Sequence, residues 1–170
     1  MKKSLLSVLF LLPFAAAFAQ EMKPPKEVSD LGWMVGTWTG SGKISFGSQE
    51  VAITTTMTVS FDGQFLKTVS TDKSGGFTMT KTVMVGWDAK KNQYDSYTFT
   101  NMAPKARIAH GKMDGNKLVM ESEPWEAEGM TAVARETMSK ISDTKTGLMM
   151  EFKNGEKWDK GMDFVLTKSK

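Results

Sequence analysis

The chain has 170 residues, with 22 lysines and arginines against 19 aspartates and glutamates, one histidine and no cysteine. The lack of cysteine excludes disulfides, a cysteine nucleophile and a lipid-anchored cysteine. No run of lysine and arginine is interleaved with aromatic residues, so the sequence does not predict a nucleic-acid partner.

Residues 1–19 have the three parts of a secretory signal peptide. Lys2 and Lys3 form a positive start, residues 4–14 are apolar, and residues 17–19 read Ala-Phe-Ala, a cleavage signal. The apolar stretch is shorter than the ~20 residues that span a bilayer, which favours a cleaved leader over a membrane anchor. We therefore expect an exported protein, periplasmic or secreted, with no transmembrane segment after cleavage.

The segment that follows predicts a tether and then one folded domain. Residues 20–27 contain two adjacent prolines and mixed charge, which favours a flexible leader. Residues 28–170 are long enough to bury a single core without disulfides. Ser29 or Asp30 can cap a short helical turn that ends near Gly36.

The first predicted strand, residues 37–46, alternates without a break. Its inner face carries Trp38, Gly40 and Gly42, and its outer face is polar. The tryptophan is expected to plug one end of a barrel. The glycines remove inner-face side chains, which favours sharp bending of the strand over close approach of a ligand.

Nine further segments have the same period of two, separated by turn signals every ~8 to 12 residues. Asp62-Gly63 is the strongest hairpin signal among them. Ten antiparallel strands with no amphipathic helix beyond the entry turn predict an all-β, closed up-and-down barrel, because closure removes exposed edges. The predicted strands are 37–46, 51–61, 65–71, 77–87, 94–100, 106–113, 117–123, 131–142, 147–153 and 162–168.

Five motifs carry a family resemblance. Residues 36–42, Gly-Thr-Trp-Thr-Gly-Ser-Gly, resemble the G-x-W-x-G-x-G opening of the nitrobindin-like branch of calycin barrels, which also include lipocalins and fatty-acid-binding proteins. Together with four later motifs, the chain from 28 to 168 resembles the bacterial domain of unknown function 1579. The resemblance implies a calycin, lipocalin-like β-barrel around a cavity, and it implies no particular activity. The later motifs lie at residues 62–66, 85–88, 110–115 and 162–168.

The nitrobindin branch binds haem through a histidine on a strand near the C-terminus. The only histidine here is His110, and none follows it. The resemblance therefore does not carry over a haem ligand, and the cofactor stays unassigned.

The candidate ligand-binding residues are those expected to face the interior. Arg107 and Arg135 are the only arginines, and either one in an apolar chamber needs a carboxylate, from Glu136 or from a ligand. Alternation does not decide which way Arg135 points. Methionines on inner faces would adapt to ligands of varied shape, with copper binding as a less favoured use. The candidates are Trp38, Met57, Met79, Arg107, His110, Met120, Arg135 and Met150.

These observations predict an exported barrel that binds a small hydrophobic or amphipathic molecule, with no metal site. Two alternatives stay open. An isomerase or hydrolase would use His110, or the pair Glu121 and Glu123, as acid or base. A filled barrel would be structural. The sequence assigns no ligand and no oligomeric state.

Overall fold

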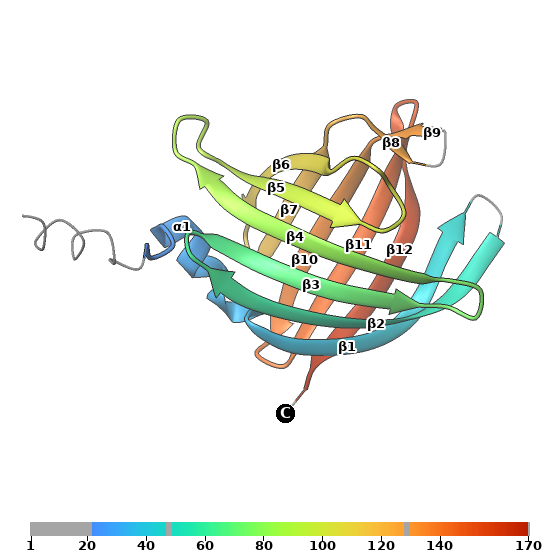
Figure 1. Cartoon of the computed structure of the whole chain (residues 1–170), viewed down its shortest axis with the longest axis horizontal. Coiled ribbons are helices and arrows are strands. Elements are labelled where there is room, and N and C mark those ends of the chain that lie inside the picture. The colour runs from blue at the N-terminus through green and yellow to red at the C-terminus, as the bar shows by residue number, and fades with distance from the viewer. Residues whose placement is uncertain (1–21, 47–48, 128–129, 170) are drawn as a thin grey trace, which may run out of the picture.

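The structure, a computed structural model, describes residues 22–46, 49–127 and 130–169 (Figure 1). The predicted signal peptide, residues 1–19, lies outside the described residues. The helical elements are α1 (Lys26–Ser29) and η2 (Asp30–Met34). The strands are β1 (Gly36–Phe46), β2 (Gln49–Asp62), β3 (Phe65–Lys73), β4 (Thr78–Asp88), β5 (Gln93–Thr100), β6 (Arg107–Asp114), β7 (Lys117–Ser122), β8 (Trp125–Ala127), β9 (Met130–Ala132), β10 (Ala134–Ser142), β11 (Lys145–Asn154) and β12 (Lys157–Lys168).

Ten strands close into an antiparallel barrel, in the order β1-β12-β11-β10-β7-β6-β5-β4-β3-β2. Neighbours in the chain are neighbours in the barrel, except that β7 pairs with β10 because the separate hairpin β8–β9 lies between them in sequence. The predicted all-β, closed up-and-down barrel is therefore confirmed. Among the helices of the described segments, none combines the length and apolar character needed to cross a bilayer.

The turns follow the sequence signals, and two strand boundaries do not. Gly63 has a φ of 57°, as the Asp62-Gly63 hairpin requires. The strand predicted over 131–142 is divided at Val133 into β9 and β10. The last strand begins well before residue 162. A bulge at Gly161 interrupts its pairing with β11, so that Met150 pairs with Met162 and Glu151 pairs with Lys160.

One end of the barrel is sealed by α1 and η2, which lie beside the left-hand end of the strands in Figure 1. Val28, Leu31 and Met34 are buried there against Trp38, which is 1% exposed. The indole Nε1 donates a hydrogen bond of 2.7 Å to the carbonyl oxygen of Met34. The predicted tryptophan plug is thus anchored to the helical turn that precedes it.

The two inner glycines of β1 make room for β12. A Cβ at Gly42 would lie 2.7 Å from the Cβ of Phe164, and a Cβ at Gly40 would lie 2.6 Å from the carbonyl oxygen of Val165. Both distances are shorter than side-chain atoms tolerate. The close approach that these glycines permit is therefore with the neighbouring strand.

Candidate functional site

Six of the eight candidate residues face the barrel interior. Residues paired across neighbouring strands share a face, so the register that joins Trp38 to Met57 fixes the inner face of each strand. Four of the six are buried, and the methionines at 79 and 150 are half-buried. The inner-facing candidates are Trp38, Met57, Met79, Arg107, Met120 and Met150.

The interior arginine has a protein partner. Arg107, 8% exposed, forms an ion pair with Glu136 of β10, and its Cζ lies 5.2 Å from the ring centroid of Trp125. Trp125, on the β8–β9 hairpin, stacks on Phe152 at 6.5 Å. Burial alone would raise the pKa of Glu136, but the charges of Arg107 and Lys81 outweigh burial and lower it. Of the two partners that the sequence left open, the structure uses Glu136.

A second interior ion pair was not expected from the sequence. Asp72 of β3 is 1% exposed, and the ammonium of Lys81 on β4 lies 2.8 Å from its Oδ2. The hydroxyl of Thr55 donates to Oδ1 at 2.7 Å. These two pairs bring two positive and two negative side chains to the inner wall, and their charges balance.

Most buried polar side chains of the inner wall lie on one half of the barrel. Of the ten buried polar residues in the described part of the chain, eight lie on inner faces of β2–β7. The inner face of β1 and β10–β12 is mainly apolar. Its polar exceptions include Glu136, which pairs with Arg107 two strands away, and Thr146, which donates to a backbone carbonyl. The polar side chains on the inner face of β2–β7 are Thr55, Thr68, Ser70, Asp72, Lys81, Ser96, Thr98, Arg107 and Ser122, and the same strands also carry the inward apolar residues Ile53, Met57, Met79, Val83, Leu118 and Met120. The apolar half comprises Trp38, Ile44, Met138, Leu148, Met150, Phe152, Met162, Phe164 and Leu166.

Several inner-face side chains keep accessible surface. Val83 on β4 and the pair Leu148 and Met150 on β11 are only half-buried, although they point inward. The side chain of Glu136 is 28% accessible. Because β4 and β11 are five strands apart around a ring of ten, this accessible surface belongs to opposite walls.

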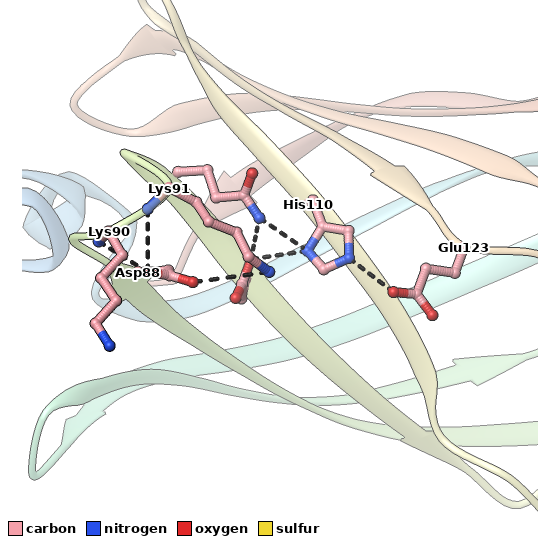
Figure 2. Close-up of polar contacts among 7 residues, drawn as sticks. Asp88, Lys90, Lys91, His110 and Glu123 are labelled. Atoms are coloured by element: carbon pink, nitrogen blue, oxygen red, sulfur yellow. Dashed lines mark hydrogen bonds and ion pairs between the residues drawn. The ribbon is translucent and has the colours of Figure 1, made fainter.

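His110 lies on the outer face of β6, between the inward residues Ala109 and Gly111. Figure 2 shows Glu123 beside one edge of its ring. Nε2 lies 2.9 Å from Glu123, and Nδ1 lies 2.7 Å from Asp95. The hydrogen bonds that the ring donates to Glu123 and Asp95 raise the pKa of the imidazole and favour its charged form.

This arrangement occupies the groups that an enzyme or a metal site would use. Both ring nitrogens of His110 are engaged, and Glu123 binds the imidazole instead of acting with Glu121 as a free pair. Over the described ranges, no cluster of histidine, aspartate and glutamate side chains is arranged to hold a metal ion. The structure therefore places the predicted acid–base candidates outside the barrel interior.

Arg135 also points outward, opposite to the adjacent Glu136. Its Nε donates to Glu151 at 2.8 Å, and its Cζ lies 4.4 Å from the ring centroid of Trp158. The register with Glu121 on one side and Glu151 on the other places it on the outer wall. The interior candidate among the two arginines is thus Arg107.

Two hollows are formed by other residues than the inward candidates. One, of about 420 Å³, lies on the outer wall of β3–β5 beside Phe65, Asp95 and Tyr97. The other, of about 590 Å³, is lined by β1, β2 and the residues after β3, including Lys43 and Lys73. Both are wide and shallow, and the candidate residues of the interior do not contribute to either.

Comparison with known proteins agrees with the fold. No curated protein matches the chain. Thirteen solved chains match, among them the crystal structure of Rv2717c from M. tuberculosis, with a TM-score of 0.62 and 10% identity over 86% of this chain and 99% of that one. At this identity the likeness shows the fold alone. The family described as "Protein of unknown function (DUF1579)" matches residues 23–168, and the chain therefore belongs to that family, as the motifs predicted.

Proposed function

We propose that this barrel binds a small amphipathic molecule in its interior, without catalysis, and that it does so after export from the cytoplasm. The observation that carries the proposal is accessible surface on inward side chains of opposite walls, above an end sealed by Trp38. Accessible apolar surface at Leu148 and Met150 favours a partner with hydrocarbon. The charged and hydroxyl groups of β2–β6 favour one that also forms hydrogen bonds.

The polar groups of the interior support binding over chemistry. Arg107 and Lys81 each have a carboxylate partner, so neither is a free cation that a reaction could use to stabilise developing charge. His110, whose imidazole is the usual general acid or base near neutral pH, faces outward between two carboxylates. Arg107 and Lys81 can still orient a ligand in the interior by hydrogen bonding.

The test compares ligand binding by two variants, one with a larger side chain inside the barrel and one with the same side chain outside it. Met150→Trp places an indole on the inner face of β11, and Met149→Trp places one on the outer face of the same strand. The probe is 8-anilinonaphthalene-1-sulfonate, an aromatic amphiphile whose emission rises in apolar sites. Circular dichroism and urea denaturation of both variants check that the barrel is intact.

We expect Met150→Trp to weaken probe binding at least roughly tenfold, a loss of about 1.4 kcal/mol, and Met149→Trp to leave it unchanged. Native mass spectrometry of wild-type protein from its own host should also reveal a bound small molecule that Met150→Trp lacks. Equal binding by both variants and no retained molecule would overturn the proposal.

Export has its own test. We expect the full chain, expressed in a Gram-negative host, to be released from the periplasm by osmotic shock. Its measured mass should be that of a chain that begins at Gln20. A chain that keeps residues 1–19 and stays with the cytoplasm would refute export and leave the binding proposal standing.

A further inference from the structure

The polarity of the interior differs across the barrel. Above the sealed end, hydroxyl and charged side chains lie on β2–β7, while β10–β12 and β1 present methionine, leucine and phenylalanine. The inward hydroxyls are concentrated on β3 and β5, whereas β2 and β4 also carry inward apolar side chains, among them Ile53, Met57 and Val83. A molecule in this space would meet the hydroxyls of β3 and β5 along one side and mainly hydrocarbon along the other.

The hydroxyls of the polar wall are available to a ligand. Thr55 donates to Asp72, and Ser122 accepts a hydrogen bond from the backbone of β10. Within the segments that the structure describes, no hydrogen bond joins a protein group to the hydroxyls of four other residues on this wall, each of which can donate and accept. Those four are Thr68, Ser70, Ser96 and Thr98.

The carboxylate of Asp72 adds a further unused acceptor. Its Oδ1 receives the hydrogen bond from Thr55, but its buried Oδ2 receives none, although the ammonium of Lys81 lies 2.8 Å away. An ion pair without a directed hydrogen bond leaves a lone pair of this oxygen free for a donor. A ligand hydroxyl would supply that donor.

The two interior ion pairs disfavour a ligand that carries a net negative charge. Lys81 and Arg107 are neutralised by Asp72 and Glu136, so a free carboxylate on the ligand would have to displace a protein carboxylate. The wall therefore favours hydroxyl groups, which both donate and accept, over a single anionic head.

We propose that the ligand is a facial amphiphile, an elongated molecule with hydroxyls along one edge and hydrocarbon along the other, held with its hydroxyls toward β3–β6. This inference rests on the proposed function and names the class of ligand for the same interior. A linear lipid with one polar head matches the two walls less well, because its tail would lie along the hydroxyls of β3 and β5.

The experiment compares two detergents with the same sulfobetaine head, each used below its critical micelle concentration. CHAPS carries hydroxyls on one face of a rigid steroid skeleton, whereas dodecyl sulfobetaine has a linear chain. Titration calorimetry on the full mature barrel should give at least roughly tenfold tighter binding of CHAPS, equivalent to about 1.4 kcal/mol.

Variants locate the effect. Ser96→Ala with Thr98→Val removes two inward hydroxyls of β5 at nearly constant shape, and Thr80→Val with Thr82→Val removes two outward hydroxyls of β4 as a control. We expect the inward pair to weaken CHAPS about tenfold and to leave dodecyl sulfobetaine unchanged, since each lost hydrogen bond costs about 0.5–1.5 kcal/mol. The outward pair should change neither affinity.

The outcomes separate this inference from the function on which it rests. Equal or tighter binding of dodecyl sulfobetaine, or an inward variant that binds CHAPS as the wild type does, would overturn the facial amphiphile and leave the binding barrel in place. Binding of neither detergent, together with equal dye binding by the Met150 and Met149 variants, would overturn both.

Discussion

Two arginine–glutamate pairs, one inside the barrel and one outside, differ in what surrounds them. Arg107 and Glu136 face the interior, with 9% and 28% of their side-chain surfaces accessible. Arg135 and Glu151 lie on the outer wall, with 32% and 15% accessible. Each guanidinium also lies over a tryptophan ring, at 5.2 Å for the inner arginine and 4.4 Å for the outer one.

A shift of one residue along a strand decides whether an ion pair lies in the interior or in contact with water, and therefore how much each charge depends on its partner. Arg135 and Glu136 are adjacent, so they point to opposite faces of β10. The outer pair is open to water, which solvates either charge when its partner is removed. The inner pair holds charges that the interior solvates poorly, so each charge depends on the other.

The largest effect is expected from Arg107→Met, which leaves Glu136 inside the barrel without its main partner. The free energy of unfolding at pH 7 should fall by about 3 kcal/mol, the lower end of the range for a broken buried pair, because Lys81 gives partial compensation. Urea denaturation measures the loss. The wild-type pKa of Glu136 is lowered, so its contribution is present above the ordinary value of 4.5 and disappears as pH falls through the folded value. The deficit of the variant should therefore shrink in acid; a deficit below 1 kcal/mol at pH 7 would contradict the comparison.

Removing both inner charges should cost less than removing one. Arg107→Met with Glu136→Met leaves no unpaired charge, and the new side chain at 136 faces Met120 and Met150. We expect at least half of the stability lost in Arg107→Met to return, because a buried ion pair replaced by apolar residues of similar size is often neutral. A double-mutant cycle with Glu136→Met alone gives the coupling energy. Additive losses would show that the pair does not act as a unit.

The fold followed from local patterns that tertiary structure did not override. Unbroken alternation over residues 37–46, the Asp62-Gly63 turn and the regular spacing of later turns specify an antiparallel barrel without any knowledge of pairing. The alternation of apolar and polar residues does not predict where a β-bulge occurs. An extra residue such as Gly161 reverses the phase of alternation, so the early part of β12 did not look like a strand.

The site was predicted only in part, because a face assignment needs register. Alternation left the direction of Arg135 open, because Val133 and Ile141 favoured an inward arginine while Ala132, Ala134 and Met138 favoured the opposite side. Val133 lies between β9 and β10, and Ile141 lies at the register shift near the end of β10. Neither residue reports the face of the regular strand between them. Asp72 was missed because the predicted strand ended at residue 71, whereas β3 continues to Lys73.

A smaller effect is expected from Arg135→Met on the outer wall. Glu151 stays close to solvent when its partner is lost, so the free energy of unfolding should fall by less than about 1 kcal/mol. The loss should decrease further in 0.5 M salt, because screening already weakens the pair in the wild type. Urea denaturation at low and high salt checks this, with Arg107→Met measured in parallel. A loss as large as that of the inner variant would mean that the barrel wall does not separate the two environments.

The smallest effect is expected from His110→Gln, and its dependence on pH is more informative than its size. Charged His110 contacts Asp95 of β5 and Glu123, beside Glu121 of β7. The pKa of the imidazole is raised, so its contribution is fully present below the ordinary value of 6.5 and is lost as pH rises through the folded value. Burial would raise the pKa of Asp95, but the hydrogen bond from His110 lowers it. The contribution of the Asp95 carboxylate to stability is therefore lost only as the pH falls below the ordinary value of 3.8.

Wild type should therefore exceed His110→Gln in stability by up to about 1 kcal/mol at pH 5.5, and the two should converge near pH 9. Urea denaturation at both pH values makes the comparison. The variant Asp95→Asn should reduce the pH 5.5 advantage without removing it, because Glu123 still holds Nε2. An advantage of the same size at pH 5.5 and pH 9 would mean that His110 stabilises the protein through packing alone. Its charge would then add nothing to the free energy of unfolding.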